Sequence, residues 1–136
     1  MEREIVRDMF FLQQKSQPVT AEDLPLVQDL ADTFRAHRSH CAGMAGNMIG
    51  YLKRMIIAAD GPLTLVMLNP VIIQKKKAYE TEEGCLSLTG QRKTVRYREI
   101  TVTWQDLSFH RHTKKYSGWI AQILQHEIDH LDGIII

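Results

Sequence analysis

The stretch from Gln125 to Gly133 constrains the fold of this chain more than any other. It reads Gln-His-Glu-Ile-Asp-His-Leu-Asp-Gly and places His126 and His130 four residues apart. Residues at i and i+4 lie on one face of a helix, so the two imidazoles can bind one cation, with Glu127 beside it. Two histidines that merely cap a core face would not account for Glu127 at the general-base position. The pattern therefore predicts a buried helix that carries a metallohydrolase site.

A third metal ligand has to come from elsewhere in the chain. Two imidazoles bind a transition metal only loosely, and a catalytic site usually adds a third protein ligand and leaves a fourth position for water. Cys85 is the strongest candidate, in a segment that reads Glu-Gly-Cys-Leu-Ser. A thiolate is a good ligand, and the neighbouring Gly84 lets the backbone come close to the metal. Asp129 and Gln125 are candidates for holding the ligands in orientation.

Residues 83–87 and 125–133 resemble the second and third signature motifs of peptide deformylases, and they match at every specified position. The first motif of that family, Gly-x-Gly-Leu-Ala-Ala-x-Gln, corresponds to residues 41–48. Here Cys41, Gly46 and Met48 replace the first glycine, the second alanine and the glutamine. The resemblance covers nearly the whole chain, with two motifs intact and one altered.

The resemblance implies a metal-dependent hydrolase that removes the N-formyl group from the N-terminal methionine of nascent polypeptides. A metal-bound hydroxide would attack, with Glu127 as general base and acid. The metal ligands would be Cys85, His126 and His130. The cofactor would be one Fe2+ per chain, and Zn2+, Ni2+ or Co2+ could replace it.

The resemblance also implies the substrate site. The peptide would lie as an extended strand against backbone near Gly43 and Gly84. The backbone N–H of Leu86 would be a catalytic donor to the oxyanion, together with a glutamine amide whose position is Met48 here. Two further residues, Trp119 and Ile123, would shape the methionine pocket.

The replacement of the family's glutamine by Met48 is compatible with more than one function. A thioether donates no hydrogen bond, and loss of one oxyanion donor typically slows a reaction by about 100- to 1000-fold. One possibility is a deformylase active on formyl-methionyl peptides or a related N-acyl substrate. The alternative is a divergent deformylase-like protein with weak or no activity. Asn47 is the nearest substitute donor in the sequence. A generic peptidase is less favoured, because most His-Glu-x-x-His enzymes take a third ligand after the helix and this chain ends soon after His130.

Composition and charge limit the classes of partner that this chain is expected to bind. The chain has 136 residues, of which 44% are hydrophobic, which suits a single deformylase-like domain over residues 1–136. A net charge of +1 gives no reason to expect a nucleic-acid site or a membrane surface as partner. No apolar run approaches a membrane span, and the first residues carry both charges, so we expect a cytoplasmic protein. The expected partner is a formyl-methionyl peptide or a nascent chain at the ribosome.

Histidines outside the motif could suggest further metal sites. His37, His40 and Cys41 follow a predicted helix, but the group lacks a fourth ligand, and basic side chains suit a helix C-terminus. We therefore favour a structural role for them. His110 and His112 share one face of a predicted strand and are expected to be exposed or packing residues.

Hydrophobic periodicity and turn residues predict an α+β fold, with antiparallel β-sheets packed around a central C-terminal helix. A second helix, from Asp23 to about His37, should lie outside the sheets. Ser117 can cap the last helix. The predicted strands are 51–59, 63–68, 71–73, 95–104 and 109–116. The predicted turns are 60–62 and 69–70. We expect Lys75 to Lys77 in a loop or at an edge, and Val95 and Tyr97 on the inward face before a bulge.

Overall fold

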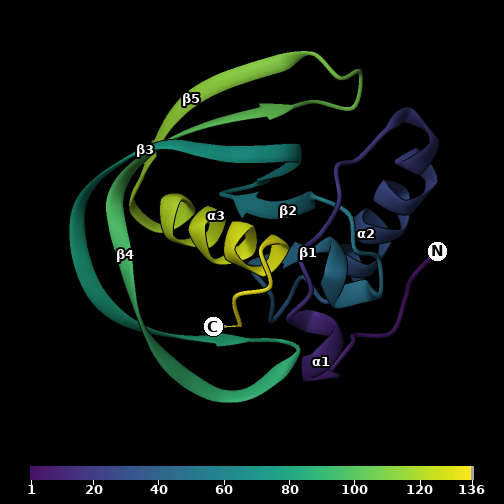
Figure 1. The fold of residues 1–136 in the computed structure, drawn as a ribbon, viewed down its shortest axis with the longest axis horizontal. Coiled ribbons are helices and arrows are strands. Elements are labelled where there is room, and N and C mark those ends of the chain that lie inside the picture. Colours follow the sequence, from purple (N-terminus) through teal and green to yellow (C-terminus); the bar gives the residue numbers. More distant parts are fainter. Residues whose placement is uncertain (136) are drawn as a thin grey trace.

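A computed structural model describes residues 1–135 of the chain. One antiparallel sheet of five strands, in the order β1-β2-β3-β4-β5, curves around the C-terminal helix α3 (Figure 1). The strands are β1 (Gly43–Ala45), β2 (Met55–Asp60), β3 (Leu63–Cys85), β4 (Leu88–Gln105) and β5 (Arg111–Ser117). The helices are α1 (Met9–Leu12), α2 (Leu24–Ala36) and α3 (Gly118–Leu131), with short 3-10 helices η1 (Ala21–Asp23) and η2 (Gly46–Ile49). The predicted α+β class, with antiparallel strands around a C-terminal helix, is confirmed.

Helix α3 is buried because its apolar residues pack against the sheet on several sides. Ala121, Leu124 and Leu131 have no exposed surface. Gln125 fastens the helix to β4, since its side chain accepts from the backbone N–H of Tyr97 and donates to the carbonyl of the same residue, both at 2.8 Å. Ser117 occupies the predicted N-cap position, but its side chain makes no capping hydrogen bond. The burial of this helix places its polar motif inside the protein.

Helix α2 lies outside the sheet, close to the predicted bounds, and packs on β1, β2 and η2. Val27, Leu30 and Phe34 form its buried face, with the helical spacing expected from the sequence. Asp23 is the residue before its first turn, but its carboxylate accepts from the backbone of Thr20 rather than from the helix. Within residues 1–135, no helix is long and apolar enough to cross a membrane.

Strand β3 corrects the predicted turn at residues 69–70. The expected strands 63–68 and 71–73 are one strand that continues to Cys85. Lys75 to Lys77 lie within it, exposed, beyond the part that pairs with β2, so they are at an edge of the described sheet, as one of the two predicted alternatives had it. The predicted turn at Asn69 is a bulge, with a register shift between Leu68 and Val71. Asn69 adopts a left-handed backbone, with φ of 51°, which is why the sequence resembles a turn there.

The inward face of β4 also differs from the prediction. Val95 is 51% exposed, whereas Arg96 is 4% exposed and points inward. The expected bulge between Tyr97 and Ile100 is absent from the described pairing with β3. The irregularity lies on β3 instead, between Ile72 and Gln74. Hydrophobicity alone predicts the wrong inward face for this part of β4. The inward position is taken by Arg96, a charged residue that can be buried because it is paired with carboxylates.

Candidate active site

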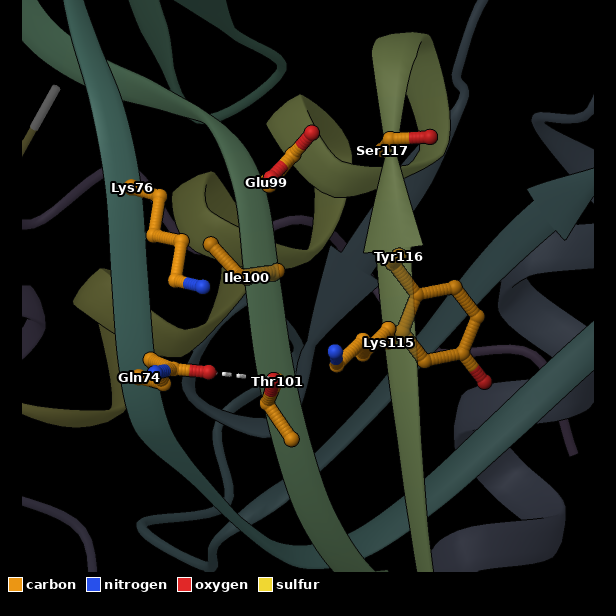
Figure 2. A pocket seen from close by; sticks show the side chains of 8 residues that line it. All are labelled: Gln74, Lys76, Glu99, Ile100, Thr101, Lys115, Tyr116 and Ser117. Carbon is orange, nitrogen blue, oxygen red and sulfur yellow. Dashed lines mark hydrogen bonds between the residues drawn. The ribbon is translucent and has the colours of Figure 1, made fainter.

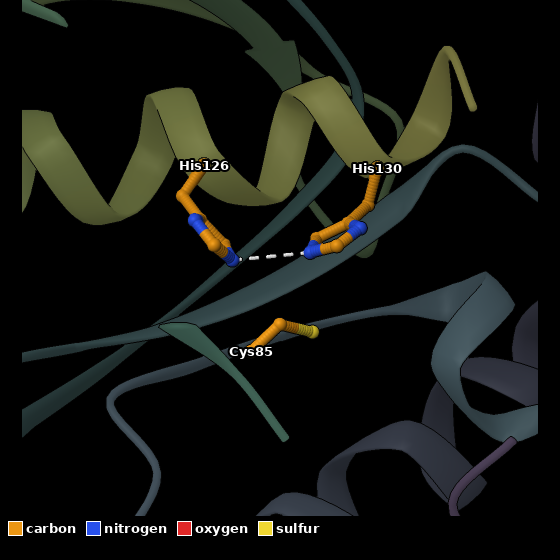
Figure 3. Close-up of side chains that lie close together, drawn as sticks. All are labelled: Cys85, His126 and His130. Carbon is orange, nitrogen blue, oxygen red and sulfur yellow. Dashed lines mark hydrogen bonds between the residues drawn. The ribbon is translucent and has the colours of Figure 1, made fainter. Parts of the chain in front are cut away.

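The predicted metal ligands come together between the end of β3 and the C-terminal half of α3 (Figure 3). The ligand atoms of Cys85, His126 and His130 all lie within 4.8 Å of one another. The two Nε2 atoms of the histidines are 3.1 Å apart. Two nitrogens bound to one tetrahedral zinc ion are separated by about 3.3 Å, so this spacing fits a single divalent cation. A thiolate and two imidazoles form a donor set typical of zinc or ferrous iron.

A carboxylate behind His126 fixes the orientation of that ligand. Glu83 lies 2.8 Å from Nδ1 of His126, and because a carboxylate can only accept, Nδ1 carries the proton. The lone pair of Nε2 is thereby left for a cation. Glu83 is held in turn by the buried Arg96, at 2.7 Å, and by the amide of Gln122, at 2.8 Å.

The same arginine reaches Asp129, at 2.5 Å, so it bridges strand β3 and helix α3. Asp129 therefore acts on the ligands through Arg96 and Glu83, while Gln125 acts by fastening α3 to β4. Sequence reasoning did not find Arg96. The local pattern gave no signal for it, because Arg96 stands between Val95 and Tyr97, which look like the inward-facing residues, and it pairs with Tyr79 of β3 rather than with Glu83.

Burial and neighbouring charges shift the pKa values of the residues in this cluster. Burial would raise the pKa of Glu83, but hydrogen bonds from His126, Arg96 and Gln122 lower it to about 2. Burial would lower the pKa of His126, but its bonds with Cys85 and Glu83 raise it to about 10. Burial and the neighbouring His126 lower the pKa of His130 to about 3.

Glu127 lies beside the ligands and is suited to proton transfer. It is 5% exposed, and its Oε1 atom has no hydrogen-bond partner within residues 1–135. Burial raises its pKa to about 7, the range in which a carboxyl group can both take and return a proton at neutral pH. Strand β1 comes close to it: a Cβ on Gly43 would lie 2.9 Å from Oε2 of Glu127. Only glycine fits at that position without moving the carboxylate.

A cavity of about 270 Å³ opens onto this cluster. Its walls are the segment before β1 and the end of β3, and its floor is α3. The expected substrate residues all line it, together with Leu86, Cys85, His126 and Glu127; they are Gly43, Met48, Gly84, Trp119 and Ile123. Trp119 is 64% exposed. The structure thus brings together every site residue expected from the sequence, since His130 completes the ligand group.

Residues that the sequence did not assign to the site also line the cavity. They are His40, Cys41, Ala42, Glu82, Glu83, Gln91 and Gln122. His40 contacts His37 at 3.3 Å and Ser39 at 3.1 Å. Among residues 1–135, Cys85, His126 and His130 are the only group of three side chains spaced to hold a metal.

Neither Met48 nor Asn47 offers an amide donor to the cavity. Met48 is buried, and its sulfur accepts from the backbone N–H of Ala45 at 3.3 Å. The amide of Asn47 donates to the carbonyls of Leu12, at 3.3 Å, and His130, at 2.9 Å. The expectation that Asn47 could replace the missing glutamine was therefore wrong, because its side chain holds the backbone of α3.

A second hollow, of about 280 Å³, lies over β3, β4 and β5 (Figure 2). Its lining residues are Gln74, Lys76, Glu99, Ile100, Thr101, Lys115, Tyr116 and Ser117. It contains no histidine or cysteine, so the chemistry described above belongs to the cavity beside α3.

Comparison with known proteins identifies the family. Residues 3–136 match the family of polypeptide deformylases. The chain belongs to the peptide deformylase family. A peptide deformylase of Clostridium beijerinckii is 51% identical over 136 residues, which is 100% of both chains. Peptide deformylase 1 of Clostridium perfringens is 35% identical over 81% of this chain and 76% of its own length.

Solved structures agree with the sequence relatives. The class I type b peptide deformylase of Acinetobacter baumannii with Met-Ala-Ser bound superposes with a TM-score of 0.89 at 26% identity, covering 99% of this chain and 97% of that one. The peptide deformylase of Thermus thermophilus gives a TM-score of 0.86 at 30% identity, covering 99% and 83%. Together the comparisons support a deformylase, an enzyme of a metal-dependent family, and do not favour the alternative of a protein with weak or no activity.

Proposed function

We propose that the chain removes the N-formyl group from the N-terminal methionine of nascent polypeptides, giving formate and a free amino terminus. One observation carries the proposal: a single cavity joins the ligand cluster of Cys85, His126 and His130 to the buried carboxyl of Glu127. The substrate would be a formyl-methionyl peptide or a nascent chain at the ribosome, and the compartment the cytoplasm. The structural neighbour that holds Met-Ala-Ser supports a peptide in the equivalent cavity.

The three ligand residues would hold one Fe2+, with Zn2+, Ni2+ or Co2+ able to replace it. That cation would supply an activated water and polarise the formyl carbonyl. Glu127 takes a proton from the attacking water on its carboxylate oxygen and returns it to the departing amino nitrogen. Glu83 keeps the Nδ1 proton of His126 in place throughout, because its pKa of about 2 leaves it ionised.

The remaining residues bind and orient the peptide. The backbone at Gly43 and Gly84 flanks the cavity, where an extended chain can lie against it. Ile123, Trp119 and Met48 provide apolar surface for the methionine side chain. The backbone N–H of Leu86 donates to the oxygen that becomes negatively charged. Met48 adds no donor, so Leu86 carries a larger share of that stabilisation than in a site with two donors.

The experiment is formate release from formyl-Met-Ala-Ser by anaerobically purified protein loaded with Fe2+ or Ni2+. We expect turnover by the wild type and none by Glu127→Ala, because the buried carboxyl is the only proton carrier proposed beside the ligands. We expect Met48→Gln to be faster, by up to about 100-fold, if the amide restores a second oxyanion donor. A metal-loaded wild type that releases no formate contradicts the proposal.

A further inference from the structure

Two consecutive residues of the N-terminal segment, residues 1–8, join the two sides of the cavity. The backbone N–H of Val6 donates to the carbonyl of Met48, at 2.8 Å. The guanidinium of Arg7 donates to the carbonyl of Leu86, at 3.1 Å. Met48 lies in η2 and Leu86 lies in the turn between β3 and β4, and both line the cavity. The segment therefore ties together the two positions between which the oxyanion site is expected.

The turn that carries Leu86 is short. Strand β3 ends at Cys85 and β4 begins at Leu88, so only Leu86 and Ser87 connect them. Of the hydrogen bonds described for residues 1–135, the one from Arg7 is the one that reaches the Leu86 carbonyl. Arg7 carries a permanent charge, and a charge-assisted hydrogen bond is roughly twice as strong as a neutral one. Arg7 is thus placed to restrict the orientation of the Leu86 backbone.

Orientation matters here because neither residue 47 nor residue 48 offers a side-chain donor on the wall opposite Leu86. Met48 is a thioether, and the amide of Asn47 is engaged with Leu12 and His130. An oxyanion donor is effective when it already points to the position where charge develops, so that nothing has to reorganise during reaction. With the Leu86 N–H as the proposed donor and no amide at position 48, movement of the Leu86 turn would lower the rate directly.

We propose that Arg7 is a positioning residue for deformylation: it holds the Leu86 turn so that one backbone N–H serves where a second donor is missing. The inference rests on the proposed function. Arg7 is exposed, so its replacement leaves the hydrophobic core intact. Arg3 provides a matched control, because it lies in the same segment and contacts Asp29 on α2, at 3.2 Å, rather than the cavity.

The test compares Arg7→Ala, Arg7→Lys and Arg3→Ala with the wild type, all loaded with Ni2+, using formyl-Met-Ala-Ser. Arg7→Ala should lower kcat by about tenfold, the loss expected from one charge-assisted hydrogen bond. KM and metal content should stay within about twofold, since no metal ligand or peptide contact changes. Arg7→Lys should recover part of kcat, and Arg3→Ala should equal the wild type.

A double-variant cycle separates positioning from general loss of structure. In a Met48→Gln background a second donor shares the oxyanion, so Arg7→Ala should cost less than about threefold in kcat. Wild-type kcat in Arg7→Ala, or an equal loss in Arg3→Ala, would overturn this inference while leaving the proposed function in place. A metal-loaded wild type without turnover would overturn both.

Discussion

At the scale of single residues, the state of one metal ligand depends on a carboxylate that does not touch the metal position. The Nδ1–H of His126 donates a hydrogen bond to Glu83, and Arg96 and Gln122 keep Glu83 ionised and oriented. Removing the negative charge would leave Arg96 under-compensated in a buried site and let the imidazole turn. The ligand cluster is therefore maintained by residues that the motif pattern does not reveal.

We predict that Glu83→Gln weakens metal binding by about 10- to 100-fold. A neutral amide is a weaker acceptor than a carboxylate for the hydrogen bond that the Nδ1–H of His126 donates. The dissociation constant for Zn2+, measured by competition with a chelator, checks this. Glu80→Gln, on the exposed part of the same strand, is the control and should bind as the wild type does. Equal affinities in all three proteins would show that Glu83 does not support the ligand.

At the scale of elements, the long strand β3 depends on an irregularity near its start. Asn69 sits at the bulge with a left-handed backbone. Its side chain accepts from the N–H of Val19, at 2.8 Å, and donates to the Val19 carbonyl, at 3.1 Å, and to Gln105, at 2.8 Å. This residue bends β3 without ending it and fastens the segment before η1 to the sheet.

We predict that Asn69→Ala lowers the free energy of unfolding by about 2 to 4 kcal/mol. The loss combines the hydrogen bonds of the side chain with the strain of alanine in a left-handed conformation. Asn69→Gly removes the same hydrogen bonds without that strain, so it should lose about 1 kcal/mol less. Urea unfolding of the three proteins gives both differences, and a wild-type stability for Asn69→Ala would refute this account of the bulge.

The metal ligands could be predicted because each lies in a short contiguous motif whose spacing fixes its geometry. Helix periodicity likewise located α2 and α3 within one or two residues. The interior placement of Arg96 could not be predicted, since it depends on two carboxylates brought from β3 and α3. The prediction that Asn47 could be a substitute donor failed for the same reason, because the partners of its side chain are backbone carbonyls far away in the sequence.

At the scale of the whole molecule, the N-terminal segment ties α2 to the rest of the fold. Asp29 is its main anchor, bonded to the amino group of Met1 at 2.9 Å, to Arg3 at 3.2 Å and to the hydroxyl of Tyr51 at 2.8 Å. The hydrogen bond from the Met1 amino group, followed by that from Tyr51, lowers the pKa of Asp29 to about 2.

We predict a pH-dependent loss of stability for Asp29→Asn. A carboxyl whose pKa is lower in the folded protein contributes stability above its unfolded pKa, near 4, and loses it as pH falls toward 2. The wild type should therefore be more stable than Asp29→Asn at pH 7, and the difference should shrink between pH 4 and pH 2. Thermal unfolding across this range is the measurement, with Glu2→Gln as control. A difference that does not change with pH would argue against these contacts.

The central claim is that Cys85, with His126 and His130, holds the catalytic metal of a deformylase. Cys41 lines the same cavity but lies outside the ligand group, so it provides a matched cysteine control. The decisive measurement is metal content and formate release, made together on the wild type, Cys85→Ala and Cys41→Ala. We predict one metal ion per chain and turnover in the wild type and Cys41→Ala, and neither in Cys85→Ala. Unchanged metal content and activity in Cys85→Ala would contradict the account.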